Sequence, residues 1–374
     1  MVTVDTVLLK LASRCNLDCH YCYVYNMGDE GWLAQPKRMS PEVIDSAVAQ
    51  LSLLASSQDV PFSVVFHGGE PLLIGAERFD VVCAALRGAL PPTCGLHLQT
   101  NGLLLSDAVL RTCMEHDVGV SISLDGPAAV HDRHRPDRRG AGSHSRVMEA
   151  VRRLSEHPAG SRLFTGVLAV VDLASDPGEV YSFLKSTGAP SMDFLYRDGN
   201  HDEVPVGKAS PLSTEYGDWM CRLLDVYLAD RRPVPIRVLD DMLKLLMGGI
   251  SRKEGVGLDA YGILVVDTDG SVRKNDTLKS AFGAADRFAS GWSVTTHDLR
   301  QVVASKEFAV YHHAQRPSSP VCLSCPDLRV CGGGMPAHRW RSETGFVNPS
   351  VFCADQRLLI DAMRDILSRR MLAA

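Results

Sequence analysis

Long apolar runs, a secretion signal and a strong excess of one charge are all missing from this sequence. No apolar stretch approaches about 18 residues, so no membrane span is expected. Residues 1–15 lack a basic region, an apolar core and a cleavage site, which predicts a cytoplasmic chain without a signal peptide. The formal net charge of −5 argues against non-specific binding of nucleic acid. We therefore expect neither a nucleic acid nor a membrane as a partner.

Cysteine is absent between Cys221 and Cys322, although the chain has 11 cysteines in total. The scattered thiols are interpreted as buried packing residues: Cys83, Cys94, Cys113 and Cys221. The others form one group near the N-terminus and one near the C-terminus. A disulfide framework is the alternative, but it fits poorly with a large chain that lacks a secretion signal. Tight cysteine spacing in such a chain favours a metal or an iron–sulfur cluster.

Strand-like and helix-like segments alternate through the first half of the 374 residues, which predicts βαβ units with a parallel sheet. The expected strands are 4–12, 62–69, 95–102, 118–126, 162–171 and 191–197. The expected helices between them are 41–56, 76–90, 106–116, 143–157 and 176–187. We therefore predict an α/β fold, a partial (β/α)6 barrel, over residues 1–212.

The pattern changes in the remainder, residues 213–374, for which we predict a separate extension. A loop at 197–212 leads to helices at 213–230 and 238–248, then to a hairpin that turns at Asp269-Gly270. A short helix at 296–306 precedes the second cysteine group, and a helix at 354–370 closes the chain. The distinctive residues of the barrel follow its strands, where functional groups gather in parallel α/β folds. They are the Cys15 group, 67–71, 99–102 and 123–126.

The first group, "CNLDCHYC", has its thiols at Cys15, Cys19 and Cys22. Three thiolates can ligate three irons of a [4Fe–4S] cluster and leave the fourth iron open. Zinc is the alternative, but a structural zinc site has a fourth ligand nearby, and His20 is awkwardly placed beside Cys19. With Tyr21 before the last cysteine, the motif resembles the radical S-adenosylmethionine (SAM) superfamily. That resemblance implies a [4Fe–4S] cluster, SAM, and a 5′-deoxyadenosyl radical that abstracts hydrogen.

Two further motifs support the same resemblance. "GGEP", with Gly68, Gly69 and Glu70, matches the motif that binds the SAM amino group in the superfamily. "SLDGP" and "HDRHR" resemble the sulfatase-maturase and peptide-maturase branch, which implies that Ser123, Asp125 and Arg135 contribute to SAM binding, with Ser123 and Arg135 at the SAM carboxylate. A plain turn and a solvated charged loop are the alternatives.

The C-terminal region resembles a SPASM domain, an extension that carries auxiliary iron–sulfur clusters. Cys322, Cys325, Cys331 and Cys353 match the ligands of one such cluster, which implies a second, closed [4Fe–4S] site. Ligands of the other auxiliary cluster are missing, because Asn275 and Met335 stand where cysteine is expected. Zinc in the four-cysteine site remains the alternative.

Asp276 follows one of these missing cysteines. In related sulfatase maturases an aspartate there accepts the substrate proton, so the resemblance implies a catalytic role. The alternative is a hairpin residue exposed to water.

The whole chain looks most like cyclophane-forming maturases of ribosomal peptides, which join Cβ to an aromatic carbon. This implies a precursor-peptide substrate and an external electron donor such as a flavodoxin or ferredoxin. The alternatives are formylglycine formation in a sulfatase and a non-catalytic iron–sulfur scaffold.

Overall fold

An eight-stranded curved sheet organises the chain, whose residues 2–251 and 253–372 are described by this computed structural model. The strands run in the order β6-β5-β4-β3-β2-β1-β7-β8. Their bounds are β1 Thr6–Ala12, β2 Ser63–Gly68, β3 Leu96–Thr100, β4 Val118–Ser123, β5 Phe164–Val170, β6 Met192–Leu195, β7 Ile263–Val266 and β8 Val272–Arg273. All neighbours from β1 to β6 pair in parallel, which confirms the predicted α/β fold with a parallel sheet.

The predicted hairpin extends the same sheet. β7 pairs in parallel with the free edge of β1, and β8 returns antiparallel to β7. Gly270 makes the turn because its φ of 82° is accessible to glycine at no steric cost. The sheet thus continues past residue 212, where we placed a boundary on the sequence, and that division into two domains stays a prediction.

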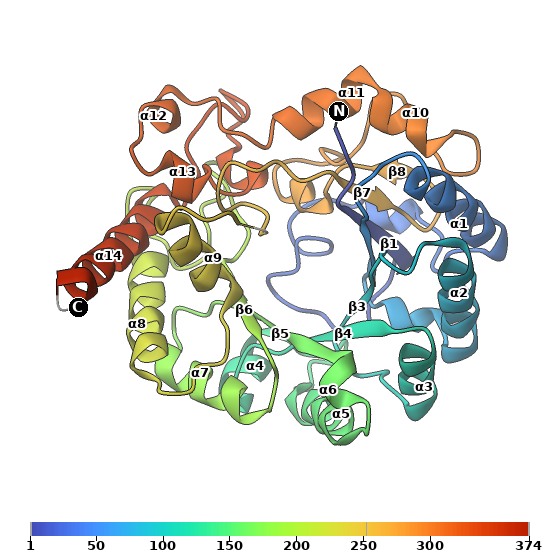
Figure 1. The fold of residues 1–374 in the computed structure, drawn as a ribbon, viewed down its shortest axis with the longest axis horizontal. Coiled ribbons are helices and arrows are strands. Elements are labelled where there is room, and N and C mark those ends of the chain that lie inside the picture. The colour runs from blue at the N-terminus through green and yellow to red at the C-terminus, as the bar shows by residue number, and fades with distance from the viewer. Residues whose placement is uncertain (1, 252, 373–374) are drawn as a thin grey trace.

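Helices cover the outer side of the curved sheet (Figure 1). Those of the barrel are α1 Pro41–Ala55, α2 Ala76–Ala89, α3 Asp107–Glu115, α4 Ala128–His134, α5 His144–Glu156, α6 Gly160–Leu163 and α7 Pro177–Ser186. Helix α1 begins where predicted, because the Ser40 hydroxyl accepts from the Val43 N–H and Pro41 occupies the first turn. Apolar strand residues pack beneath these helices, and the thiols of Cys83, Cys94 and Cys113 lie buried in that core as expected. The expectation is wrong for Cys221, which is only half-buried at the edge of the core because it lies on the partly exposed side of helix α8, Glu215–Ala229.

The second half of the chain is mostly helical. Its helices are α8 Glu215–Ala229, α9 Arg237–Leu246, α10 Leu299–Ala304, α11 Lys306–His313, α12 Pro320–Leu323, α13 Leu328–Cys331 and α14 Cys353–Leu372. Short 3-10 helices are η1 Gly31–Ala34, η2 Pro71–Ile74, η3 Asp276–Ser280 and η4 Pro336–Arg339. Helix α11 was not predicted from the sequence. Among the described helices, none has both the length and the apolarity that a bilayer crossing requires.

Helix α14 is anchored to α8 and to the 197–212 loop through Asp355. This buried carboxylate accepts a hydrogen bond from the Gly217 N–H of α8 at 2.8 Å and pairs with the Lys208 ammonium at 2.5 Å. A Cβ at Gly217 would lie 2.8 Å from the Asp355 Cα, so only glycine permits this approach of the two helices. The contact ties the C-terminal helix to α8 and to the 197–212 loop.

Candidate functional site

A cavity of about 180 Å³ lies at the carboxyl ends of the parallel strands, and we call it the chamber. Loops after β1, β2 and β3, the end of β4, and the residue after α4 contribute to its wall. It brings together most of the site residues predicted from the sequence: Cys15, Cys19, Tyr21, Cys22, Gly68, Gly69, Glu70, Ser123 and Arg135. The fold therefore assembles, at one edge of the sheet, motifs that are distant in the chain.

The loop after β1 forms tight turns that direct the three thiols to the chamber. The Cys22 N–H donates to the Cys19 carbonyl at 3.0 Å, and the Asn26 N–H donates to the Cys22 carbonyl at 2.8 Å. Asn101 Nδ2, after β3, donates to Asn16 Oδ1 at 2.7 Å and so ties this loop to a neighbouring strand end. The positions of the thiols thus depend on two separate parts of the chain.

These three thiols have the chemistry of soft metal ligands. None of them is in a disulfide. Burial raises the pKa of the Cys15 thiol to about 12 and that of Cys22 to about 11. A buried thiolate therefore needs a positive partner, which the irons of a cluster supply. The donor set fits a [4Fe–4S] cluster held by Cys15, Cys19 and Cys22.

Gly68 and Gly69 make room beside the thiols. A Cβ on Gly69 would lie 2.0 Å from the Tyr25 hydroxyl and 2.3 Å from the Arg14 carbonyl oxygen. Gly68 has φ 135° and would place a Cβ 2.1 Å from the Ala12 carbonyl oxygen. Only glycine fits at either position, so the backbone itself lines the chamber there.

Glu70 joins two loops of the chamber. Its carboxylate accepts from the Thr100 hydroxyl at 2.8 Å, the Asn101 N–H at 2.9 Å and the Leu72 N–H at 3.1 Å. Burial raises the pKa of this carboxyl, while these hydrogen bonds act in the opposite direction. The carboxylate is thus occupied by the protein, and its observed role is to hold the loops after β2 and β3 together.

Tyr21, Asp125 and Arg135 form a bonded set beside the chamber. The Tyr21 hydroxyl donates to Asp125 Oδ2 at 2.5 Å and accepts from Arg135 Nη1 at 2.9 Å. Arg135 directly follows helix α4 and is only 6% exposed. The alternative of a solvated charged loop is therefore wrong for this residue.

Arg135 lines the chamber, and its guanidinium is not fully hydrogen-bonded. Its buried Nε has no hydrogen-bond partner among the described residues. Ser123 also lines the chamber, where its hydroxyl accepts from Gln99 Nε2 at 2.9 Å. A guanidinium with a free donor fits an anionic group such as the SAM carboxylate.

Asp276 lies at the start of η3, immediately behind the chamber wall. It is 1% exposed, so the alternative of a water-exposed hairpin residue is wrong. Its Oδ2 lies 2.8 Å from Lys10 Nζ, and its Oδ1 accepts from the Tyr23 hydroxyl at 3.1 Å. Burial alone would raise the pKa of this carboxyl, but the Lys10 ammonium, with His67 and Lys279, outweighs that effect and lowers it to about 2. Asp276 is therefore ionised at neutral pH.

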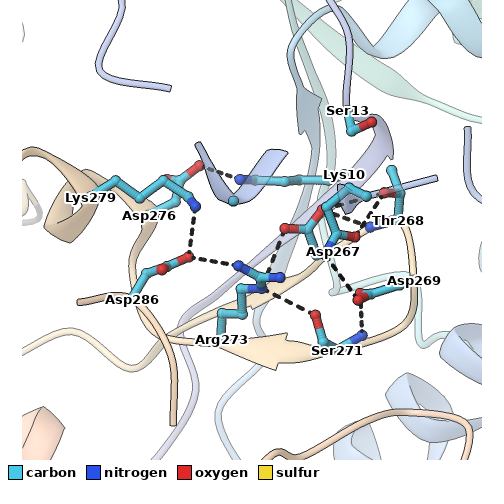
Figure 2. A network of polar contacts seen from close by, with 12 residues as sticks. Lys10, Ser13, Asp267, Thr268, Asp269, Ser271, Arg273, Asp276, Lys279 and Asp286 are labelled. Carbon is cyan, nitrogen blue, oxygen red and sulfur yellow. Dashed lines mark hydrogen bonds and ion pairs between the residues drawn. The ribbon is translucent and has the colours of Figure 1, made fainter. Parts of the chain in front are cut away.

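A network of buried charges surrounds this ion pair (Figure 2). Lys279 Nζ lies 3.2 Å from Asp286, and Asp286 also faces Arg273 at 3.4 Å. Arg273 in turn faces Asp267 at 3.4 Å. Carboxylates and cations alternate through the network, so each buried charge has an opposite neighbour. The network holds the hairpin and η3 against β1.

Sequence patterns did not indicate Lys10 and Tyr23 as members of the site. Lys10 stands alone as a charge within the otherwise apolar strand β1, and that interruption was the available signal. Tyr23 lies one residue beyond the cysteine motif and lines the chamber, but nothing in its spacing distinguishes it.

The four C-terminal cysteines lie on short segments that pack together. Cys322 is in α12, Cys331 ends α13 and Cys353 begins α14, with Cys325 between the first two helices. Burial raises the pKa of Cys331 to about 12, and the nearby thiols of the other three act in the same direction. Cys322 is buried and the other three are half-buried. Four soft ligands on neighbouring segments fit a metal centre.

Arg339 supports the loop beside these cysteines. Only 1% exposed, it donates through Nε to the Gly333 carbonyl at 2.9 Å and through Nη2 to the Gly334 carbonyl at 2.5 Å. Both glycines have positive φ, at 80° and 67°, so the guanidinium holds a backbone conformation that other residues rarely adopt.

Comparison with known proteins identifies several relatives. Residues 9–170 match the family model of the Radical SAM superfamily. The serine-type anaerobic sulfatase-maturating enzyme of Klebsiella aerogenes is 31% identical over 342 residues, covering 89% of this chain and 80% of that protein. A cysteine-type counterpart from Clostridium perfringens is 26% identical over 359 residues, covering 93% of each.

Two solved structures resemble the fold. The sulfatase-maturating enzyme anSMEcpe, with bound AdoMet and the Cp18Cys peptide, has a TM-score of 0.80 at 22% identity, covering 98% of each chain. Streptococcus suis SuiB, bound to the precursor peptide SuiA, has a TM-score of 0.62 at 14% identity, covering 94% of this chain and 76% of SuiB. These two likenesses show the fold. The family is established by the 31% identity to the Klebsiella aerogenes enzyme along 89% of this chain, together with the match to the family model: the chain belongs to the radical SAM superfamily and is a relative of the anaerobic sulfatase-maturating enzymes.

Proposed function

We propose that this protein is a radical SAM enzyme that modifies a ribosomally made peptide by joining a Cβ to an aromatic carbon. The observation that carries the enzyme class is the chamber, where three unpaired thiols face a guanidinium with a free donor. When bound, the reduced cluster and SAM supply a 5′-deoxyadenosyl radical that abstracts a hydrogen atom from the substrate.

The chain's own residues bind and orient these groups. Cys15, Cys19 and Cys22 would hold the cluster, and the backbone at Gly69 would face the SAM amino group. Arg135 and Ser123 would hold the SAM carboxylate. Asp125 keeps the Tyr21 hydroxyl in place, and that hydroxyl orients Arg135. The half-enclosed chamber limits the access of water to the reacting groups.

A peptide substrate is supported by the relatives. anSMEcpe and SuiB, which share this fold, were each solved with a peptide bound. Two departures from the SPASM pattern favour the crosslink over formylglycine formation. At both positions a cysteine is expected, and the chain has Asn275 and Met335 instead. Without cysteine there, one auxiliary cluster is lost, and we propose that the remaining one is held by Cys322, Cys325, Cys331 and Cys353. It would carry onward the electron released from the substrate, while an external donor such as a flavodoxin or ferredoxin would supply the electron for SAM cleavage.

Formation of a Cβ–aryl bond removes two hydrogens from the peptide. One leaves Cβ as an atom, and the other leaves the ring as a proton while one electron passes onward. We propose that Asp276 accepts this proton through the Tyr23 hydroxyl, which lines the chamber and donates to Asp276 at 3.1 Å. Restoration of the aromatic ring releases a strongly acidic proton, so a carboxylate with a pKa of about 2 suffices.

Formylglycine formation is the second candidate. It is supported by the 31% identity to a serine-type sulfatase-maturating enzyme. It needs the same abstraction at Cβ but forms an aldehyde rather than a carbon–carbon bond.

Mass spectrometry of peptides treated with the reconstituted protein tests the proposal. One set carries a sulfatase-type serine or cysteine, and the other consists of short peptides encoded beside the gene for this protein. The crosslink predicts a peptide that is two hydrogens lighter, resists an aldehyde-reactive hydrazide and shows linked fragments. A product that reacts with the hydrazide would instead establish the sulfatase-type activity. Absence of 5′-deoxyadenosine in all reactions would refute the enzyme class.

A further inference from the structure

A second cavity, of about 150 Å³, adjoins the chamber. The two share part of their walls, formed by Tyr23, Leu195, Tyr196 and Asp198. From this shared wall the second cavity extends toward α9 and the C-terminal extension. We call it the side pocket. A group that enters it lies beside the place where the hydrogen is abstracted.

The wall of the side pocket is mostly apolar and rich in sulfur. Methionines from three separate segments line it, together with valines and Phe194: Met220, Met242, Met335, Val238, Val256 and Val330. Methionine adapts to irregular shapes and makes favourable sulfur contacts with aromatic rings. An apolar cavity of about 150 Å³ accommodates a ring the size of benzene. Size and chemistry together match one phenyl-sized side chain.

The residues that replace the missing cysteines lie at this pocket. Met335 is part of its wall. Asn275 Nδ2 donates to Glu254, whose side chain also lines the pocket. Gly255 adds to the wall, where a Cβ would lie 2.8 Å from the Met335 sulfur, so this segment already packs closely against Met335. At these positions the chain has an apolar thioether and an amide rather than thiols.

We infer that the side pocket binds an aromatic side chain of the peptide substrate, the ring that becomes crosslinked. This inference rests on the proposed function and adds to it the class of residue that the enzyme selects. Tyr23 explains why the ring would react there, because it borders both cavities and its hydroxyl donates to Asp276. A ring in the side pocket thus lies next to the proposed proton path, while the attacked Cβ remains in the chamber.

Direct binding of small amides tests the pocket without requiring turnover. The probes are N-acetylphenylalaninamide, N-acetylleucinamide and N-acetylalaninamide, titrated into the cluster-loaded protein by saturation-transfer NMR. We expect the phenylalanine amide to bind about tenfold more tightly than the alanine amide, since its ring is fully buried. Equal binding of all three would overturn the inference.

Two substitutions locate the bound ring. Val238→Trp on α9 fills the pocket and should weaken the phenylalanine amide about tenfold. Val81→Trp is the matched control, because Val81 is 63% exposed on α2, outside the pocket. Met242→Ala enlarges the pocket and should shift the preference toward N-acetyltryptophanamide. Such a gain cannot result from misfolding, whereas unchanged preferences in both pocket variants would place the ring elsewhere.

Failure of this inference is distinguishable from failure of the proposed function. If the ring binds in the pocket but no peptide is crosslinked, the subsite stands and the proposed reaction is wrong. If a crosslinked peptide forms while Val238→Trp has no effect on its yield, the reaction stands and the subsite is wrong.

Discussion

The two cysteine groups use the same ligand chemistry but offer different numbers of thiols, three in the first and four in the second. The N-terminal group, Cys15 to Cys22, occupies a loop at the mouth of the barrel and borders the chamber. The C-terminal group, Cys322 to Cys353, lies on α12, α13, the turn between them and the start of α14, beside a loop that the buried Arg339 supports. Its Cys331 lines the side pocket. Three thiolates leave one iron of a [4Fe–4S] cluster open for a small molecule, whereas four thiolates occupy every iron. The number of ligands therefore separates a reactive site from a structural or electron-transfer site.

The largest expected effect comes from removing the first group alone. Cys15, Cys19 and Cys22 replaced together by Ala should abolish 5′-deoxyadenosine formation, because no other soft ligand of that loop faces the chamber. The wild type should bind about eight irons and the variant about four, as expected for two [4Fe–4S] clusters. Iron analysis and chromatography of the nucleoside product provide the measurement.

The half-buried, scattered thiol Cys221 provides the control, and Cys221→Ala should retain all iron and activity. Nucleoside formation by the triple variant would refute the assignment of the first group. Zinc in place of the last four irons would change the second group to a zinc site.

The next largest effect concerns the carboxylate behind the chamber. Asp276→Asn should retain both metal sites and SAM cleavage but lose most of the crosslinked product, because the amide cannot accept the proton. The ratio of 5′-deoxyadenosine to product should rise accordingly. Asp286→Asn is the control, since Asp286 belongs to the same charge network but pairs with Lys279 and Arg273 (Figure 2). An unchanged ratio in Asp276→Asn would assign a purely structural role to this residue.

A smaller effect is expected where the chamber loops are joined. Glu70→Gln leaves only one oxygen for three donors, so the protein should lose about 1–3 kcal/mol of stability. The binding of SAM, measured by equilibrium dialysis, should weaken at the same time, because the loops after β2 and β3 move apart. Glu77→Gln, on the exposed face of α2, should change neither quantity. Normal SAM affinity in Glu70→Gln would show that the loops hold their positions without this carboxylate.

The smallest effect concerns Glu254, in the side pocket between the two groups. Burial raises the pKa of this carboxyl from 4.5 to about 7, while Asn275 and Lys253 act in the opposite direction. Because the folded protein favours the protonated carboxyl, the raised pKa of Glu254 stabilises the fold at low pH. This stabilisation is complete below pH 4.5 and is lost as the pH rises through 7.

Unfolding by urea should therefore show a stability decrease of about 1–2 kcal/mol between about pH 6 and pH 8.5 that Glu254→Gln removes. This decrease is smaller than the full pKa shift would give, because the Glu254 side chain is partly accessible to water. An equal pH dependence in both proteins would show that other groups cause it.

Much of the fold followed from local sequence patterns. Strands and helices alternated with clear periodicity, and capping residues such as Ser40 marked helix starts, so the parallel sheet was predictable. Helix α4 was not predicted as a helix, because "HDRHR" is charged enough to resemble a loop. Burial of Arg135 depends on partners distant in the chain, Tyr21 and Asp125, and local composition does not reveal them.

The sequence by itself determined which ligands are available, because thiols at C-x3-C-x2-C spacing lie within one loop and need no distant partner. The tertiary structure decided the state of Asp276. Its burial and its pairing with Lys10 arise because β7 joins β1 and brings the hairpin against a strand more than two hundred residues earlier. The tertiary structure also decided that a pocket exists beside Tyr23, since its wall comes from segments throughout the chain. Ligand spacing is a local property, whereas burial, charge pairing and cavities depend on contacts that only the folded chain makes.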